Sequence, residues 1–223
     1  ETEPVFHEWM DRGLGVLGNH AGEDLRGLYL AGGDGRDAAG ERLAAPALSD
    51  PLTVIVNVAM AQLVMSWGVA PSNLVGASTG EIAAAVVAGV IGFDEAIGLA
   101  HLHGRLAEAG PADARAGARA ELRAFASALE LAPPGMPLVS GRTGAAMTLA
   151  QATSLETWVN AGGDETCLDD AIAALAARPD RVFLALAADP EFAARVRAND
   201  ALTPNQVIAA LRAPEDAVAD DVH

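Results

Sequence analysis

The residues best suited to chemistry form a short glycine-flanked motif around Ser78. The sequence reads Gly76-Ala77-Ser78-Thr79-Gly80-Glu81, which fits the Gly-x-Ser-x-Gly pattern of a nucleophile elbow. In such an elbow the glycines let the backbone turn so tightly that the serine hydroxyl stands exposed at the start of a helix. The helix dipole and the N–H groups at that point favour an oxyanion, and the backbone N–H of Thr79 is the expected donor. Ser78 is therefore the candidate nucleophile.

The sequence on either side of this motif predicts the elements that would position Ser78. Residues 73–76 predict a short strand and residues 79–88 a helix, and Asp50-Pro51 is typical of the start of another helix. Strands that alternate with helices favour an α/β fold with a parallel sheet flanked by helices on both faces. The sequence predicts further helices at 4–17, 50–67, 93–107, 118–131, 154–159 and 169–177, strands at 137–140 and 182–186, and a poorly structured stretch at 31–40.

The composition indicates one acidic, soluble domain. The chain has 223 residues and a net charge of −16, which disfavours binding to nucleic acid or to an anionic membrane. The sequence suggests no signal peptide and no apolar run long enough to span a membrane. Cys167 is the single cysteine, so we expect no disulfide framework, and no spacing of histidines and acids suggests a metal site. We therefore expect a cytoplasmic protein with no cofactor and no metal.

The residues around Ser78 resemble a known family. Trp67-Gly68-Val69, the motif 76–81 and Ala88-Gly89-Val90 together resemble the acyltransferase domains of polyketide and fatty acid synthases. Weaker matches extend the resemblance over nearly the whole chain, at residues 4–11, 48–51, 137–144, 157–159, 170–172 and 209–212. The resemblance implies the α/β-hydrolase-like large subdomain of these acyltransferases. It also implies transfer of an acyl group from CoA to an acyl carrier protein through an acyl-serine intermediate.

Several features of that family are missing from this sequence. The N-terminal Phe-Pro-Gly-Gln-Gly strand, whose glutamine helps to form the oxyanion hole in the family, has no counterpart, and Ala77 replaces the histidine of Gly-His-Ser. Only residues 108–119 lie where the family inserts a ferredoxin-like small subdomain, which needs far more chain. The family's general base belongs to that subdomain. The resemblance thus implies a single truncated acyltransferase-like domain over residues 1–223, with 205–223 as a C-terminal linker or tail.

His103 stands where the family carries the arginine that binds the malonyl carboxylate. An imidazole cannot reproduce the bidentate grip of a guanidinium, and Arg105 lies on a different side of the same predicted helix. The resemblance places His103 facing the pocket, so His103 is the candidate base for Ser78. The alternative is a histidine that only fills the vacated space. The other histidines are read as surface or structural residues: His7, His20, His101 and His223.

Three functions stay open from the sequence. The first is a degenerate, non-catalytic domain of a polyketide or fatty acid synthase with a structural or docking role. The second is an active serine acyltransferase or acyl-thioester hydrolase, with Ser78 as nucleophile, His103 as base and the Thr79 N–H in the oxyanion hole. Its substrate would be an acyl-CoA or acyl-carrier thioester without a free carboxylate. The third is an unrelated serine hydrolase that shares the elbow. Joint loss of base, carboxylate anchor and subdomain favours the first.

The resemblance implies partners from the same synthase. These are an acyl carrier protein and neighbouring domains such as a ketosynthase, with acyl-CoA or acyl-phosphopantetheine as the substrate. Because carrier proteins are usually acidic, docking needs a local basic patch. Arg115, Arg119 and Arg123 are spaced four apart on one predicted helix, and a plain solvated helix face is the alternative. Loss of the subdomain should also expose residues near 106–122, which the helical stretch 116–128 or another domain could cover.

Overall fold

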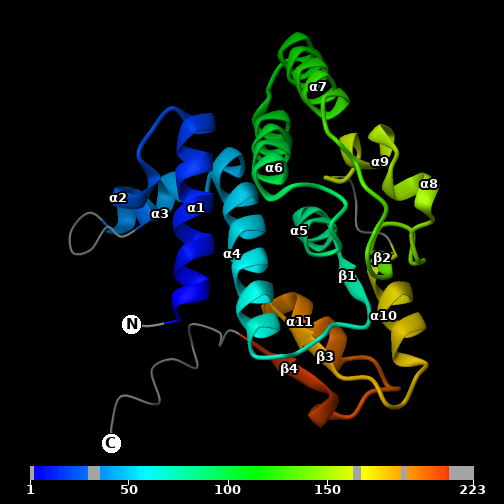
Figure 1. Cartoon of the computed structure of the whole chain (residues 1–223). Helices are drawn as coiled ribbons and strands as arrows, with labels where there is room; N and C mark the ends of the chain where they lie inside the picture. Colours follow the sequence, from blue (N-terminus) through cyan, green and yellow to red (C-terminus); the bar gives the residue numbers. More distant parts are fainter. Residues whose placement is uncertain (1–2, 30–35, 163–166, 187–189, 211–223) are drawn as a thin grey trace, which may run out of the picture.

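The computed structural model describes residues 3–29, 36–162, 167–186 and 190–210 (Figure 1). Its helices are α1 (Pro4–Ala21), α2 (Leu25–Tyr29), α3 (Arg36–Leu43), α4 (Pro46–Ser66), α5 (Thr79–Val87), α6 (Phe93–Glu108), α7 (Ala112–Ser127), α8 (Leu149–Ala152), α9 (Leu155–Val159), α10 (Leu168–Ala176) and α11 (Pro190–Arg197). Its strands are β1 (Leu74–Gly76), β2 (Leu138–Ser140), β3 (Phe183–Ala185) and β4 (Val207–Ala209), with a short 3-10 turn at Pro204–Gln206.

The strands form two small parallel sheets, each of two strands. Strand β1 pairs with β2, with Val75 opposite Val139, and β3 pairs with β4, with Leu184 opposite Ile208. The parallel pairing and the helices between paired strands confirm the predicted α/β class. The single continuous sheet that the sequence suggested is instead divided, because no described strand lies between β1 and β3.

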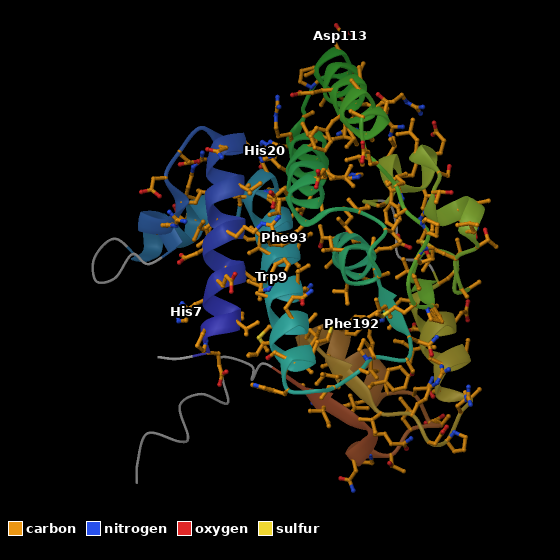
Figure 2. The ribbon with its side chains drawn as sticks, in the orientation of Figure 1. His7, Trp9, His20, Phe93, Asp113 and Phe192 are labelled. Carbon is orange, nitrogen blue, oxygen red and sulfur yellow. The ribbon has the colours of Figure 1, made fainter. Side chains whose placement is uncertain are left out.

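Helix α4 is the centre of the core. It packs against α1, α5 and α6 (Figure 1), and its residues Val54, Ile55 and Val58 are fully buried. By length and composition α4 is apolar enough to cross a membrane, contrary to our reading of the sequence. More than half of its apolar stretch is buried inside the protein, however, as expected for a core helix. Trp9 of α1 and Phe93 of α6 pack edge to face between these helices, with ring centroids 4.9 Å apart (Figure 2).

The start of α4 differs from the prediction. We expected Asp50 to cap the helix, but α4 begins at Pro46 and Pro51 lies inside it. Pro51 has no N–H to donate to the carbonyl of Ala47 four residues earlier. The ring of His101 in α6 donates its Nδ1–H to that carbonyl at 2.7 Å, because a carbonyl oxygen can only accept. Helix α6 therefore compensates for the proline and lets α4 begin earlier.

Two further residues of α6 hold the same helix start. The Glu108 side chain accepts a hydrogen bond from the Ala47 N–H at 2.8 Å, one of the N–H groups that a helix start leaves unpaired. At Gly104 the backbones approach so closely that a Cβ would lie 2.1 Å from the Pro46 carbonyl oxygen. Helices α4 and α6 therefore touch through backbone atoms here, and this contact fixes α6 relative to the core.

Helix α7 covers the surface left by the missing subdomain. Three residues separate α6 from α7, too few for an inserted subdomain, as predicted. Helix α7 begins at Ala112 rather than at 118 and packs against α6 and α9, with Leu122 and Ala126 buried beneath it. The sequence left two candidates for covering this surface, the helical stretch 116–128 and another domain. In the described part of the chain, α7 lies over it.

Two other segments differ from their predictions. Helix α3 occupies Arg36–Leu43 and so overlaps the second half of the stretch 31–40 that was predicted to be poorly structured; residues 30–35 lie outside the described part. Strand β4 lies within the predicted tail 205–223, where Val207 is buried against Leu168 and Val196. The prediction of a tail is thus corrected for Val207–Ala209, whose short apolar run gave little signal. Residues 211–223 lie outside the described part.

Candidate functional site

Ser78 lies in a tight turn between β1 and α5, as the motif predicts. Its backbone has φ 50° and ψ −125°, and it is the one non-glycine residue with positive φ in the described ranges. This conformation is disfavoured for a residue with a side chain, at about 1–3 kcal/mol, and is typical of a nucleophile elbow. The turn closes at once into a helix, since Gly80 N–H donates to Ala77 at 2.9 Å and Glu81 N–H to Ser78 at 3.0 Å.

The two glycines of the motif differ in how much space they leave for a side chain. A Cβ at Gly76 would lie 2.3 Å from the carbonyl oxygen of Gly80, whereas a Cβ at Gly80 would meet no atom within 4 Å. Gly141, directly after β2, donates its N–H to the Gly76 carbonyl at 2.8 Å, and a Cβ there would lie 2.9 Å from Ala77 Cβ. The elbow is therefore held from two sides by backbone contacts that leave no room for side chains.

The elbow opens on a cleft of about 880 Å³ between α4, α5, β1 and β3. Ser78 and Thr79 lie in its wall, and Phe192 of α11 lines it below α5 (Figure 2). Thr79 is the first residue of α5, so its N–H has no partner within the helix and can act as the expected oxyanion donor. The charged residues among those described in this lining are Arg178, Asp180 and Arg181. No pattern in the sequence singled these three residues out.

His103 is placed away from this cleft. It is buried in α6, and its Nε2–H donates to the carbonyl oxygen of Trp158 in α9 at 2.8 Å. The other ring nitrogen, Nδ1, faces the backbone at Gly162, where an added Cβ would lie 2.9 Å from it. Burial lowers the pKa of His103, and the bond to Trp158 opposes this shift. His103 is absent from the described lining of the cleft, so these contacts do not bring it together with Ser78.

The other described histidines also have surroundings away from Ser78. His7 is exposed in α1 (Figure 2). His20, also exposed, lies beside His101, with ring centroids 6.1 Å apart, and beside Phe125. Partial desolvation of its ring, and secondly the neighbouring His101, lower the pKa of His20. His101 is structural, as expected, through its bond to the Ala47 carbonyl. His223 lies outside the described residues.

Glu81 follows the elbow inside the protein. Its side chain is fully buried, with one carboxylate oxygen 4.0 Å from Arg142 Nε. Arg142 follows Gly141 in the turn after β2, so this contact joins that turn to the first turn of α5. The motif includes Glu81, but the sequence gives no signal for Arg142, because the two residues are far apart in the chain.

The arginines of α7 have mixed surroundings. Arg123 forms an ion pair with both carboxylate oxygens of Glu156 in α9, and Arg115 donates to the Ala109 carbonyl at 3.3 Å. Ion pairing neutralises the charge of Arg123, so the predicted basic face of three arginines is reduced to Arg115 and Arg119.

Known proteins with related sequences are polyketide synthases. The chain is 35% identical over 122 residues to the spectinabilin polyketide synthase system protein NorC of Streptomyces orinoci, which covers 55% of this chain and 5% of that protein. It is 31% identical over 144 residues to the highly reducing polyketide synthase Preu1 of Preussia isomera, covering 65% and 6%. The chain thus corresponds to about a twentieth of these proteins. No protein-family model matches the chain.

Solved structures with the same fold are acyltransferases. The acyltransferase domain of ZmaA superposes with a TM-score of 0.78 at 20% identity, covering 88% of this chain and 61% of that one. MCAT from Streptococcus pneumoniae gives 0.71 at 17% identity, covering 97% and 90%. The chain therefore has the fold of these acyltransferases. The sequence relatives, of which the chain spans only a small part, are polyketide synthases.

Proposed function

We propose that this chain is a non-catalytic acyltransferase-like domain with a structural or docking role in a polyketide or fatty acid synthase. The observation that carries the proposal is the placement of His103, which donates to the Trp158 carbonyl and lies outside the cleft around Ser78. A serine hydroxyl without a base in hydrogen-bond reach is a poor nucleophile. No histidine occurs among the described residues that line the cleft.

The lack of a carboxylate anchor from α6 supports the same proposal. The resemblance assigns the position of His103 to the family's carboxylate-binding arginine, and its buried imidazole with lowered pKa carries no fixed positive charge. The alternative anchors, Arg178 and Arg181, come from the segment between α10 and β3. Arg181 donates one guanidinium N–H to the Leu175 carbonyl at 3.3 Å, which ties it to α10.

One observation favours the second function, an active acyltransferase or acyl-thioester hydrolase. Ser78 keeps the strained backbone of a nucleophile elbow, and strain of this kind concentrates at functional sites. In that case the Ser78 hydroxyl oxygen attacks the thioester carbonyl, the Thr79 N–H stabilises the oxyanion, and the C–S bond breaks as the sulfur takes up the serine proton. The acyl group then passes from Ser78 to a carrier thiol or to water. The substrate would be an acyl-CoA or acyl-phosphopantetheine without a free carboxylate, and no other cofactor is required.

The proposed partners follow from the relatives. Because those proteins are much longer polyketide synthases, we expect this domain to contact neighbouring synthase domains such as a ketosynthase, and an acyl carrier protein through the α7 face of Arg115 and Arg119. A cytoplasmic location is part of the same proposal.

Intact-mass spectrometry after incubation with acetyl-, malonyl- and longer acyl-CoAs tests both functions. Non-catalytic function predicts no adduct and no thioester turnover with the folded protein. An adduct that is lost in Ser78→Ala would contradict it and would name the preferred acyl group. If an adduct forms, His103→Ala tests whether His103 is the base, and His20→Ala is the matched control. If His103 is the base, activity should be lost in His103→Ala and kept in His20→Ala.

A further inference from the structure

Helix α7 is held to the rest of the fold by few buried side chains. It has 16 residues, and Leu122 and Ala126 are the two that are buried. Residues 112–117 are all exposed, and Asp113 in the first turn lies at the outer tip of the molecule (Figure 2). Segments with few buried apolar contacts and exposed backbone hydrogen bonds open most easily in a folded protein. We therefore expect α7 to open more readily than the core helices α4 and α6.

Hydrogen bonds on both sides of α7 mark the limits of the segment that carries it. Before α7, the Glu108 side chain at the end of α6 accepts from the Ala47 N–H at 2.8 Å. After α7, the Ala132 N–H donates to the Val90 carbonyl at 3.0 Å. Residues 109–131 lie between these two anchors, so this segment is one unit that is tied to the core at each end.

Two ion pairs at the surface orient α7 on its neighbours. Arg105 of α6 donates to the Glu121 side chain at 2.7 Å, and Arg123 donates to both carboxylate oxygens of Glu156 in α9. All four side chains are about half exposed. Ion pairs of this kind contribute little to stability and are screened by salt. They position α7 without locking it, and its opening should increase with ionic strength.

Phe125 is the side chain of α7 that covers both α1 and α6. Its ring lies edge-on to the ring of His20 in α1, with centroids 6.2 Å apart. A Cβ added at Gly98 of α6 would lie 2.6 Å from Phe125 Cζ and 2.9 Å from His20 Nε2. The three groups are thus packed together, and movement of α7 away from α6 would expose His20 and the backbone of α6 at Gly98.

The surroundings of His20 link this contact to pH. Desolvation, and secondly the charge of His101 in α6, lower the pKa of His20. Phe125 and Gly98, which face the same ring from α7 and α6, carry no charge. When α7 moves away, water replaces Phe125 and the desolvation decreases, so the open state binds the proton of His20 more tightly. The closed state is therefore weakened as pH falls below about 6.5, the ordinary pKa of a histidine, and keeps its full stability above it.

We propose that residues 109–131 form a hinged cover over α6, which opens as a unit while the rest of the fold stays intact, and that acid and salt favour the open state. Opening exposes His20 and the face of α6 at Gly98. The cover is a conformational device of the chain itself and does not depend on whether Ser78 is acylated.

Thiol reactivity of single-cysteine variants of the whole chain, in a Cys167→Ser background, tests the cover. Ala126→Cys places the thiol on the buried face of α7, Ala100→Cys places it in the core on α6, and Ala124→Cys places it on the exposed face of α7. Dithiodipyridine reacts with a thiol only when it is accessible. We expect Ala126→Cys to react about a hundredfold faster than Ala100→Cys, because the second requires unfolding of the core. Leu122→Cys repeats the measurement at the other buried position of α7.

Loss of an ion pair and a change of pH should shift the opening. Glu156→Gln should raise the reaction rate of Ala126→Cys by about threefold and leave that of Ala100→Cys unchanged. The rate for Ala126→Cys divided by that for Ala124→Cys at the same pH cancels the ionisation of the thiol. This ratio should rise by about threefold from pH 7.5 to pH 5.5. The rise should be lost in His20→Gln and kept in His7→Gln, which changes an exposed histidine of the same helix.

Two results would overturn the proposal. Equal reaction rates for Ala126→Cys and Ala100→Cys, with the same dependence on urea, would show that α7 opens only when the whole domain unfolds. A rate ratio that is independent of pH, or that changes equally in His20→Gln, would show that His20 does not control the cover.

Discussion

The ring of His101 in α6 supplies the hydrogen bond that Pro51 cannot make within α4. Its Nδ1–H lies 2.7 Å from the Ala47 carbonyl oxygen, the group that an N–H at position 51 would reach in a regular helix. A proline inside a helix costs about 3 kcal/mol or more, partly through this lost bond. A side chain from another helix therefore recovers part of that loss, and it does so at the first turn of α4.

Replacing His101 should reveal this compensation. His101→Leu leaves a part-buried carbonyl without its donor, and we expect the free energy of unfolding to fall by about 2 kcal/mol. In a Pro51→Ala background an amide N–H returns to the helix, so the same substitution should have a smaller effect, by about 1 kcal/mol. Urea unfolding of the four proteins in this cycle measures the difference. Equal effects of His101→Leu in both backgrounds would contradict the compensation.

The close approach of α4 and α6 gives a second prediction. Gly104→Ala places a Cβ 2.1 Å from the Pro46 carbonyl oxygen, a backbone atom that cannot rotate away. We expect a loss of about 3 kcal/mol in unfolding free energy. The matched control is Gly117→Ala in α7, where a Cβ would meet no atom within 4 Å, and which should stabilise by about 0.5–1 kcal/mol. Thermal and urea unfolding measure both, and a neutral Gly104→Ala would show that the helices can separate without loss.

The sequence predicted well the elements whose structure depends on residues that are close together in the chain. The elbow needed only Gly76, Ser78 and the apolar residues around them, and strand β1 and helix α5 match the prediction within a residue or two. The start of α4 could not be predicted, because it depends on His101 and Glu108, which are remote in sequence. The division of the sheet depends on which strands meet across the fold, and no local pattern encodes that pairing.

The candidate site was predicted in part for the same reason. Ser78 and Thr79 are identified by a contiguous motif and lie at the cleft. The assignment of His103 came from counting along a helix, which places a residue on a face but does not reveal what that face contacts. Its partner, the Trp158 carbonyl, lies 55 residues away. Arg178 and Arg181 reach the cleft from a segment without any motif, so only the fold brings them there.

The strained backbone of Ser78 should be measurable as stability. Ser78→Gly keeps the turn and removes the side chain that disfavours φ 50°, so we expect the free energy of unfolding to rise by about 1 kcal/mol. Ser78→Ala keeps a Cβ and should not give this gain. Urea unfolding of the two variants compares them directly, and equal stability would mean that the turn stores no strain.

The glycines of the elbow should differ in the same assay. Gly76→Ala puts a Cβ 2.3 Å from the Gly80 carbonyl oxygen, and we expect loss of the folded state or a fall of about 3 kcal/mol or more. Gly80→Ala adds a methyl group in open space within the first turn of α5 and should be neutral or slightly stabilising. The fraction of folded protein by circular dichroism separates the two. A tolerated Gly76→Ala would contradict the close contact that defines the turn.

Asp50 makes the stability of the domain depend on pH. Burial, and secondly the nearby charge of Glu108, raise the pKa of Asp50 from 3.8 to about 6. The folded state thus binds this proton more tightly than the unfolded state does, so the Asp50 contribution to stability falls as pH rises from about 4 to about 6. Asp50→Asn removes the charge, and we expect it to stabilise by about 1 kcal/mol at pH 7, a value reduced for the partial exposure of the side chain.

Urea unfolding of the wild type and Asp50→Asn at pH 3.5, 5 and 7 measures this dependence. The gain from the substitution should be small at pH 3.5, where Asp50 is mostly protonated in both states, and should be complete at pH 7. In a Glu108→Gln background the gain should shrink, because one of the two causes of the raised pKa is removed. A gain that stays constant from pH 3.5 to 7 would show that Asp50 acts through packing and not through its charge.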